Sequence, residues 1–345
     1  MSDDSGPGDT MRQRVGSRLD RFRLYVLLDI GRLKLAGALT VGMFLVFFVA
    51  GALSFPPFRT YMQNMGPSRY LFQAFVGALI TGVTLVVSIN QLVISQELGS
   101  LGSQRERMSG SVGFRGDVED AFGSVSPPEP EAFLKALIDN TRQDAERLRE
   151  AVSDHSNDEV VEKTRQVTDD IIDNAEVVSE ELSGKSFGDY AVVKAALDYN
   201  YSYKVYQVRR LRVKFGDDFT DDQTKALRDL SDVLAFYGPA REHIKTLYFQ
   251  WELVDLSRGM IYTSISALAV TGTLALYLSP NSVPDSTLGV DNLVWVVSAG
   301  AAIGTFPFML LSTYILRLAT IAKRTLAIGP FILRSSERSS DIEWD

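Results

Sequence analysis

Four stretches without a charged residue constrain most strongly how this chain can fold. They cover residues 35–55, 70–95, 260–279 and 293–316, and each is about 20 residues long or longer. A helix of about 20 apolar residues spans the hydrocarbon core of a bilayer. The sequence therefore predicts an all-α integral membrane protein with four transmembrane helices in two hairpins.

Basic residues near the ends of these stretches predict the orientation. Residues 11–34 contain seven Lys or Arg, whereas loop 280–292 contains none and loop 56–69 contains only Arg59 and Arg69. Lys and Arg close to a span favour the cytoplasmic side. We therefore expect a protein of the cell membrane, with both termini and the long middle segment in the cytoplasm.

These patterns divide the chain into six expected parts. They are a disordered, basic N-terminal segment (1–34), a first transmembrane hairpin (35–95), a Gly/Pro-rich bent connector (96–128), an acidic cytoplasmic helical domain (129–258), a second transmembrane hairpin (259–316) and a cytoplasmic C-terminal tail (317–345).

The middle segment has helical periodicity and no strand alternation. We expect helices over 129–152, 158–182 and 190–215, and a fourth that begins at Thr220, where Gln223 completes a capping box. In the second helix an apolar seam at three-four spacing indicates a bundle; it consists of Val160, Thr164, Val167, Ile171, Ala175, Val178 and Leu182.

Two courses are open for the fourth helix of this segment. It either breaks at Gly238-Pro239 or passes through that kink, past Asp255 and Arg258, into the third apolar stretch. The second course gives one helix that belongs to both the bundle and the membrane region.

The negative charge is concentrated in the middle segment. The chain has a net charge of −8, and residues 96–255 alone contain 32 acidic and 20 basic residues. An acidic surface disfavours nucleic acid as a partner, because phosphate binding needs a basic face. The acidic surface either keeps the domain soluble or docks a cytoplasmic protein partner. The Asp-rich, Lys-poor composition (27 Asp, 10 Lys) resembles that of proteins from salt-loving archaea, or simply an ordinary acidic protein.

No pattern that supports enzyme chemistry is present. The chain has no cysteine, and its two histidines, His155 and His243, lie far apart in charged helical sequence. Phosphate-binding glycine loops and nucleophile elbows are absent. The four stretches also lack the ionisable groups that proton-coupled transport uses. We therefore expect no catalytic, cofactor-binding or metal-binding residues, and a protein that is not an enzyme.

The polar residues of the second stretch fall on one side of the expected helix. They recur at intervals of three and four, which at about 100° per residue places them within an arc of roughly 80°. The stripe consists of Gln73, Gly77, Thr81, Thr84, Ser88, Gln91 and Ser95. Polar groups within a membrane face protein or water. The stripe therefore either packs against neighbouring helices or lines a hydrated path between several copies of the chain.

The other three stretches differ in their polar content. In the fourth, Gly300 and Gly304 form a Gly-x-x-x-Gly pair that predicts close helix packing. The third carries Ser and Thr around its whole circumference, which favours a position surrounded by other helices. The first contains only Thr40 as a polar residue before Ser54 near its end, and is expected to face lipid.

The arrangement of two membrane hairpins around a helical insert resembles that of the bestrophin anion channels, in topology only. The second stretch and its exit, residues 90–107 (NQLVISQELGSLGSQRER), resemble more closely a group of uncharacterised four-span membrane proteins of haloarchaea. That resemblance implies the four-span fold over most of the chain and implies no function.

Two functions follow as hypotheses. The first is a homo-oligomeric ion channel or pore whose second span lines the axis, with Arg59 and Arg69 as charges at the outer mouth that favour anions. The second is a membrane-anchored scaffold or signalling protein whose acidic domain docks a partner. Both imply membrane lipid as a partner, and the first implies self-association.

Overall fold

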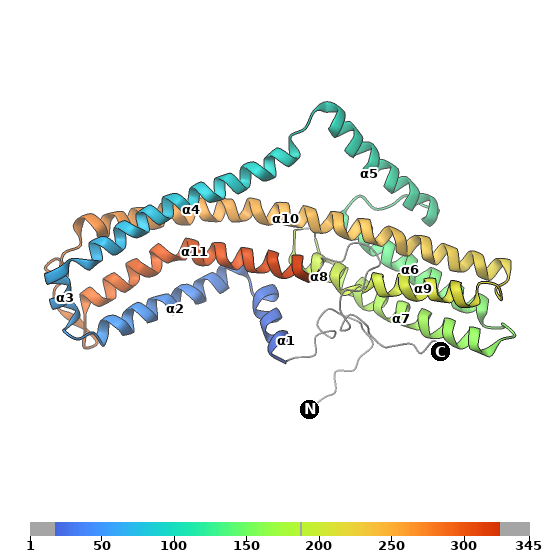
Figure 1. Ribbon diagram of the computed structural model, residues 1–345, viewed down its shortest axis with the longest axis horizontal. Coiled ribbons are helices and arrows are strands. Elements are labelled where there is room, and N and C mark those ends of the chain that lie inside the picture. The colour runs from blue at the N-terminus through green and yellow to red at the C-terminus, as the bar shows by residue number, and fades with distance from the viewer. Residues whose placement is uncertain (1–17, 187, 325–345) are drawn as a thin grey trace. The chain divides into compact units, whose positions relative to one another are not determined.

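The computed structural model describes residues 18–186 and 188–324 and is built almost entirely from helices (Figure 1). Two short strands, β1 (Ser286–Thr287) and β2 (Val290–Asp291), pair antiparallel as a hairpin. The chain forms two compact units. The apolar unit consists of Tyr25–Leu98 and Gln250–Ile321, and the helical bundle chiefly of Gly99–Phe249.

The apolar unit contains α2 (Arg32–Ala52), α3 (Phe58–Met65), α4 (Pro67–Glu97), the C-terminal part of α10 (Asp221–Tyr277) and α11 (Asn292–Arg324). Among the described residues, α2, α4, α10 and α11 are the four helices long and apolar enough to cross a membrane. The predicted all-α fold with four such helices is therefore confirmed at this level.

Close contacts at small residues hold the helices of the apolar unit together. A Cβ at Gly300 would lie 2.3 Å from Leu274 and 2.9 Å from Phe72, and one at Gly304 would lie 3.0 Å from Thr271. Glycine lets helices approach this closely. Both glycines of the predicted pair thus lie at helix–helix contacts between α11 and its neighbours.

The helices of this unit differ in how deeply they are enclosed. In α11, 61% of the most apolar window is buried, against 11% in α2 and 22% in α10. The peripheral position expected for the first span agrees with this, but the prediction that the third span is surrounded is wrong. Three of its hydroxyls, those of Thr263, Ser266 and Thr273, donate to carbonyls of their own helix, whereas the buried hydroxyl of Ser264 has no partner among the described residues.

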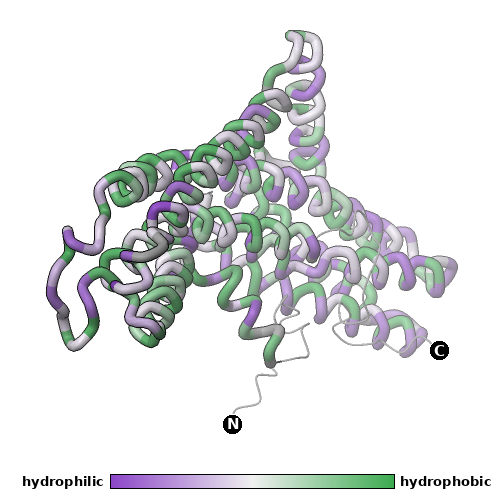
Figure 2. The backbone as a smooth tube through the Cα atoms, turned by 60° about the vertical axis from the view of Figure 1, so that its left-hand side comes forward, coloured by the Kyte–Doolittle hydropathy of each residue, from purple (hydrophilic) through white to green (hydrophobic). Residues whose placement is uncertain are grey.

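The outer surface of the apolar unit exposes many large apolar side chains, with examples on α2 (Leu45, Val46), α4 (Leu85) and α10 (Ile265). Figure 2 shows hydrophobic colour along these helices, whereas hydrophilic and hydrophobic residues alternate along the bundle. Contiguous exposed apolar surface on this scale marks a site of interaction with a membrane or another protein.

The bundle contains α5 (Leu101–Phe122), α6 (Pro130–Val152), α7 (Asp158–Leu182), α8 (Tyr190–Asp198) and α9 (Tyr201–Phe215), together with the N-terminal part of α10. The apolar seam predicted in α7 is buried along its whole length. It packs against α6, whose buried residues recur at the same three-four spacing. This part of the sequence-based prediction is confirmed.

The prediction of a bent connector was wrong for α5. Ser100 begins this helix by accepting a bond from the Ser103 amide, and Gly123 ends it at φ +66°. The helix is anchored by Phe114, whose ring lies 6.2 Å from that of Phe133 and 5.9 Å from that of Phe236. Glycine only weakens a helix, by about 1 kcal/mol per residue, and such packing outweighs it.

The helix predicted over 190–215 is interrupted between α8 and α9. Asn174 of α7 lies beside the break, where its amide donates to the Asp198 carbonyl and its carbonyl accepts from the Asn200 amide, each at 3.3 Å. A buried break leaves backbone groups that need partners. A side chain from another helix provides them, which local sequence does not reveal.

The structure shows where α10 begins and that it continues past Pro239. Thr220 and Gln223 exchange the two bonds of the predicted capping box, at 3.0 and 3.4 Å. The helix then runs without interruption for 57 residues with Pro239 inside it. Of the two alternatives, a break at Gly238-Pro239 is therefore wrong and the continuous helix is confirmed.

The segment before α2 is helical where it is described. It forms α1 (Arg18–Leu24) and a π-helical turn (Tyr25–Asp29), in which Leu24 and Leu28 are buried. The prediction of disorder over 1–34 is thus wrong for 18–34, because these apolar side chains are buried. Residues 1–17 of that segment and 325–345 of the predicted tail lie outside the described residues.

Candidate functional site on α4

All seven residues of the predicted stripe are exposed on α4. The buried side of the same helix carries Phe72, Leu79 and Val86, which are 0–2% exposed and recur every seven residues. At 100° per residue these positions lie roughly opposite the stripe. Within the apolar unit no described helix covers the stripe, so packing inside this unit does not explain it.

The hydroxyl groups of the stripe bond to their own helix. Thr81, Thr84 and Ser88 donate to the carbonyls of Gly77, Ile80 and Thr84, each at 3.0 Å, and Ser95 donates to that of Leu92 at 2.7 Å. These bonds use the hydroxyl protons and leave oxygen lone pairs facing outward. The middle of the stripe is therefore a neutral row of acceptors.

The two amides of the stripe are different. Gln73 and Gln91 are exposed, and neither has a hydrogen-bond partner among the described residues. A primary amide has two donors and a carbonyl oxygen, too many for its own helix to satisfy. These two side chains are the ones that most need water or another protein chain.

The packed side of α4 is held by a close approach to α11. A Cβ at Gly82 would lie 3.3 Å from the ring of Phe308, so a larger residue there would push the two helices apart. Phe72 lies in a cluster with Met62, Leu293 and Val297. The direction of the stripe is thus fixed by packing on the far side of its helix.

The two arginines predicted at the outer mouth have different environments. Arg59 forms a two-pronged ion pair with Asp291, from Nε to Oδ2 at 2.7 Å and from Nη2 to Oδ1 at 2.5 Å. It also donates to the carbonyls of Pro280 and Val283. Arg69 is exposed. Arg59 thus ties α3 to loop 280–292, and its assignment to an outer mouth stays a prediction.

The pKa values of this pair reflect the contact. Burial acts to raise the pKa of Asp291, but hydrogen bonds from Arg59 and from the Leu293 amide outweigh it, so this pKa lies below its ordinary value. The hydrogen bond to Asp291 raises the pKa of Arg59. With the charge of Arg59 neutralised, only Arg69 still supports the predicted preference for anions.

Three polar residues of α11 face inward, unlike those of the α4 stripe, whereas Ser312 is exposed. Ser298, Thr305 and Thr313 are 1–7% exposed, and the latter two donate to carbonyls of their own helix. They lie on the enclosed helix of the unit. Among the four apolar helices, α4 is thus the one whose polar stripe faces away from the chain's own core.

A cluster of charged residues that the sequence-based prediction did not contain lies at the start of α2. Arg32 donates to the buried carboxylate of Glu252 on α10, and its guanidinium lies 4.6 Å from the centre of the Tyr314 ring on α11. Arg317 donates to the carbonyls of Leu27 and Ile30. Arg32 and Glu252 are 220 positions apart in the sequence, so local patterns could not predict that they pair. The only signal in the sequence is that both are charged residues close to an apolar stretch.

No group of three or more His, Cys, Asp or Glu side chains is arranged to hold a metal ion within the described part of the chain. His155, in the bundle, instead interacts with the backbone: its Nε2 lies 3.0 Å from the Asp218 carbonyl and its Nδ1 accepts from the Asn157 amide. The geometry of the described residues therefore directs attention to the surface of α4.

Comparison with known proteins decides the family. The model of the Family of unknown function (DUF7972) matches residues 1–345. The chain belongs to this family. No curated protein and no solved structure matches the chain. The sequence-based prediction of an uncharacterised family agrees with the match to DUF7972. The haloarchaeal origin and the bestrophin-like layout stay predictions.

Proposed function

We propose that this member of the DUF7972 family is a multi-pass protein of the cell membrane that self-associates through α4 and forms a neutral, hydrated path along the oligomer axis. The observation that carries the proposal is the outward-facing polar stripe on a helix that is otherwise apolar on its exposed side. Membrane insertion rests on the four long apolar helices, and the orientation rests on the distribution of basic residues.

The energetic reason lies in the two glutamines. An amide without hydrogen-bond partners in a hydrocarbon environment costs several kcal/mol, and neither Gln73 nor Gln91 has such a partner among the described residues. Contact with the same stripe of another copy, or with water between copies, removes this cost. Closed rotational symmetry places identical stripes around one axis.

The character of the lining follows from its composition. The stripe contains hydroxyls, two amides and a glycine but no ionisable side chain, so it has neither a proton relay nor a ring of charge. We therefore expect a path that passes water and small ions with little discrimination by charge.

Cysteine cross-linking tests the association directly, because the chain contains no cysteine. A single Thr84→Cys variant in membranes is expected to form disulfide-linked dimers under mild oxidation. Val46→Cys, on the exposed side of α2, is the control and should stay monomeric. Absence of a Thr84 cross-link, or equal cross-linking at Val46, contradicts association through the stripe.

Ion flux in planar bilayers tests the path. Thr84→Leu combined with Ser88→Leu should abolish flux without loss of folding, because leucine removes the outward acceptors. The matched control is Ser266→Leu with Thr273→Leu, which removes two exposed hydroxyls that likewise bond to their own helix, α10. Flux that survives the α4 changes, or that disappears equally in the control, rules out the pore.

A further inference from the structure

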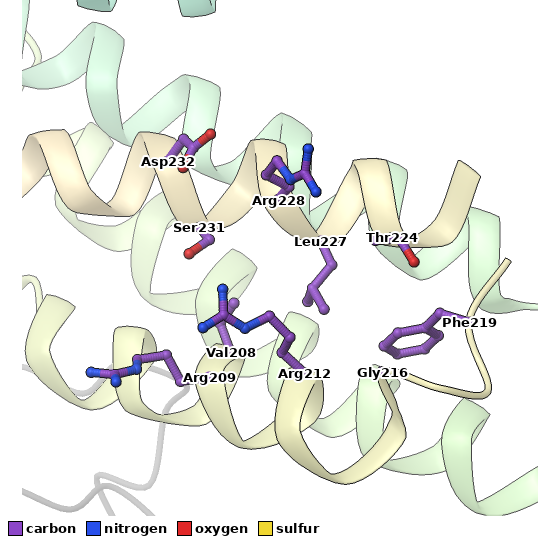
Figure 3. Close-up of a pocket in the computed structure, with 10 residues that line it drawn as sticks. All are labelled: Val208, Arg209, Arg212, Gly216, Phe219, Thr224, Leu227, Arg228, Ser231 and Asp232. Atoms are coloured by element: carbon purple, nitrogen blue, oxygen red, sulfur yellow. The ribbon is translucent and has the colours of Figure 1, made fainter. Parts of the chain in front are cut away.

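A cavity in the helical bundle brings together three arginines without ionic partners. It lies between α9 and the N-terminal end of α10, has a volume of about 150 Å³, and is lined by Arg209, Arg212 and Arg228 (Figure 3). Among the described residues none of the three makes an ion pair or a hydrogen bond.

This lack of pairing contrasts with the rest of the bundle. Many of its other basic side chains have carboxylate partners, for example Lys204 with Asp170 and Lys214 with Glu159. Carboxylates are also in excess, since residues 96–255 contain 32 acidic against 20 basic residues. The three arginines of this cavity are exposed to solvent and have no ion pair among the described residues, although carboxylates are plentiful nearby in the sequence.

The polar lining sets the charge of the ligand that would fit. Besides the three arginines the cavity has one carboxylate, Asp232, and the hydroxyls of Thr224 and Ser231. Three positive charges and one negative charge leave a formal charge of about +2, which matches a dianion. Figure 3 shows Arg212 extending from α9 into the space towards α10, whereas Arg209 extends along α9 and Arg228 lies over α10.

One end of the cavity is apolar. Phe219, from the turn between α9 and α10, and Leu227 of α10 lie there, beside Gly216 (Figure 3). A Cβ at Gly216 would be 2.4 Å from the Arg212 carbonyl oxygen, so glycine is needed to close α9 tightly at this point. The site therefore combines a cationic part with a small apolar wall.

The volume limits the size of the ligand. Sites for drug-sized molecules measure roughly 300–1,000 Å³, whereas about 150 Å³ corresponds to about five water molecules. A phosphate with a small substituent fits this space, and a nucleotide does not.

We infer that this cavity binds a small, soluble phosphate monoester, with its phosphate on Arg212 in the field of Arg209 and Arg228 and its apolar substituent against Phe219 and Leu227. The planar guanidinium matches two phosphate oxygens at once, which an ammonium group cannot do. This site is independent of the path proposed along α4.

Calorimetric titration of the full-length protein in detergent tests the inference, with phenyl phosphate and inorganic phosphate as probes. Both should bind, and phenyl phosphate should bind more tightly. Arg212→Gln should weaken both by about tenfold or more, since it removes a charge-assisted hydrogen bond to the phosphate. Phe219→Leu should weaken phenyl phosphate selectively.

The control is Arg210→Gln, on the same helix. Arg210 lies outside the cavity lining and against Tyr206, 3.3 Å from its hydroxyl oxygen, so this variant removes the same charge and should leave binding nearly unchanged. Unaltered helicity by circular dichroism shows that each variant is folded.

Three outcomes overturn the inference. The first is no binding of either probe by the unmodified protein. The second is equal weakening of binding by Arg212→Gln and Arg210→Gln, which would show that the loss comes from the change in net charge and not from a contact with Arg212. The third is Arg212-dependent binding to vesicles containing phosphatidic acid without binding of phenyl phosphate, which makes a lipid headgroup the ligand instead.

Discussion

The buried ion pair of the bundle permits a prediction in which the two partners behave differently. The side chain of Lys204 is 0% exposed and that of Asp170 is 22% exposed, and Lys204 Nζ lies 2.9 Å from Asp170 Oδ2. Removing the carboxylate leaves the buried ammonium of Lys204 without its ion-pair partner. Removing the lysine leaves a carboxylate that water can reach.

The magnitudes follow from these exposures. Breaking a buried pair by deleting one partner costs about 3–5 kcal/mol. Lys204 retains the Asp170 carbonyl at 3.2 Å and the Tyr199 ring at 5.5 Å, so we expect Asp170→Ala to lower the free energy of unfolding by about 3 kcal/mol, at the low end of that range. Lys204→Met replaces the ammonium by an apolar group of similar length and should cost less than about 1 kcal/mol.

Amide hydrogen exchange of the full-length protein in detergent, read by mass spectrometry, measures the effect in the bundle itself. A loss of about 3 kcal/mol corresponds to roughly hundredfold faster exchange of the slowest amides of α7 and α9. The double variant, Lys204→Met with Asp170→Ala, should recover most of the protection, because no unpaired charge is left buried.

Two results would refute this reasoning. One is a Lys204→Met variant as unstable as Asp170→Ala, which would mean that the pair stabilises the fold by its attraction. The other is a double variant without recovery, which would mean that the loss in Asp170→Ala comes from something other than the stranded ammonium.

Two further predictions concern the apolar unit. Gly300→Ala should lower the free energy of unfolding in detergent by about 1–3 kcal/mol, because the added methyl group overpacks against Leu274. Gly272→Ala is the control: a Cβ there would have nothing within 4 Å, so this change should be neutral or slightly stabilising. Equal effects of the two changes would contradict the packing argument. Because the folded-state pKa of Asp291 is lowered, its pair with Arg59 stabilises at pH values above the ordinary Asp range and is lost as the pH falls through the folded-state pKa. Exchange of loop 280–292 amides should therefore accelerate in acid, and Arg59→Gln should produce that acceleration already at neutral pH; a pH-independent loop would contradict this.

Local patterns determined much of the architecture. The four charge-free stretches, the seam of α7 and the capping box at Thr220 and Gln223 were all readable from the sequence, because helix periodicity and capping depend on residues within a few positions of one another. Each reappears in the structure where the pattern placed it.

The failures share a different cause. The sequence-based prediction missed the helix α5, the interruption beside Asn174 and the ion pair of Arg59. In each case the deciding partner lies far along the chain, such as Phe236 for Phe114 or Asp291 for Arg59. Residue type alone does not show which distant group a side chain meets.

The stripe on α4 combines both kinds of information. The sequence by itself determined that seven small or polar residues share one side of a membrane-length helix, because spacing fixes angle on a helix. Only the tertiary structure decided which way that side faces, because packing of Phe72, Leu79 and Val86 turns the opposite face inward. The same holds for the arginines between α9 and α10: their charge was evident in the sequence, but their shared cavity depends on how two helices pack.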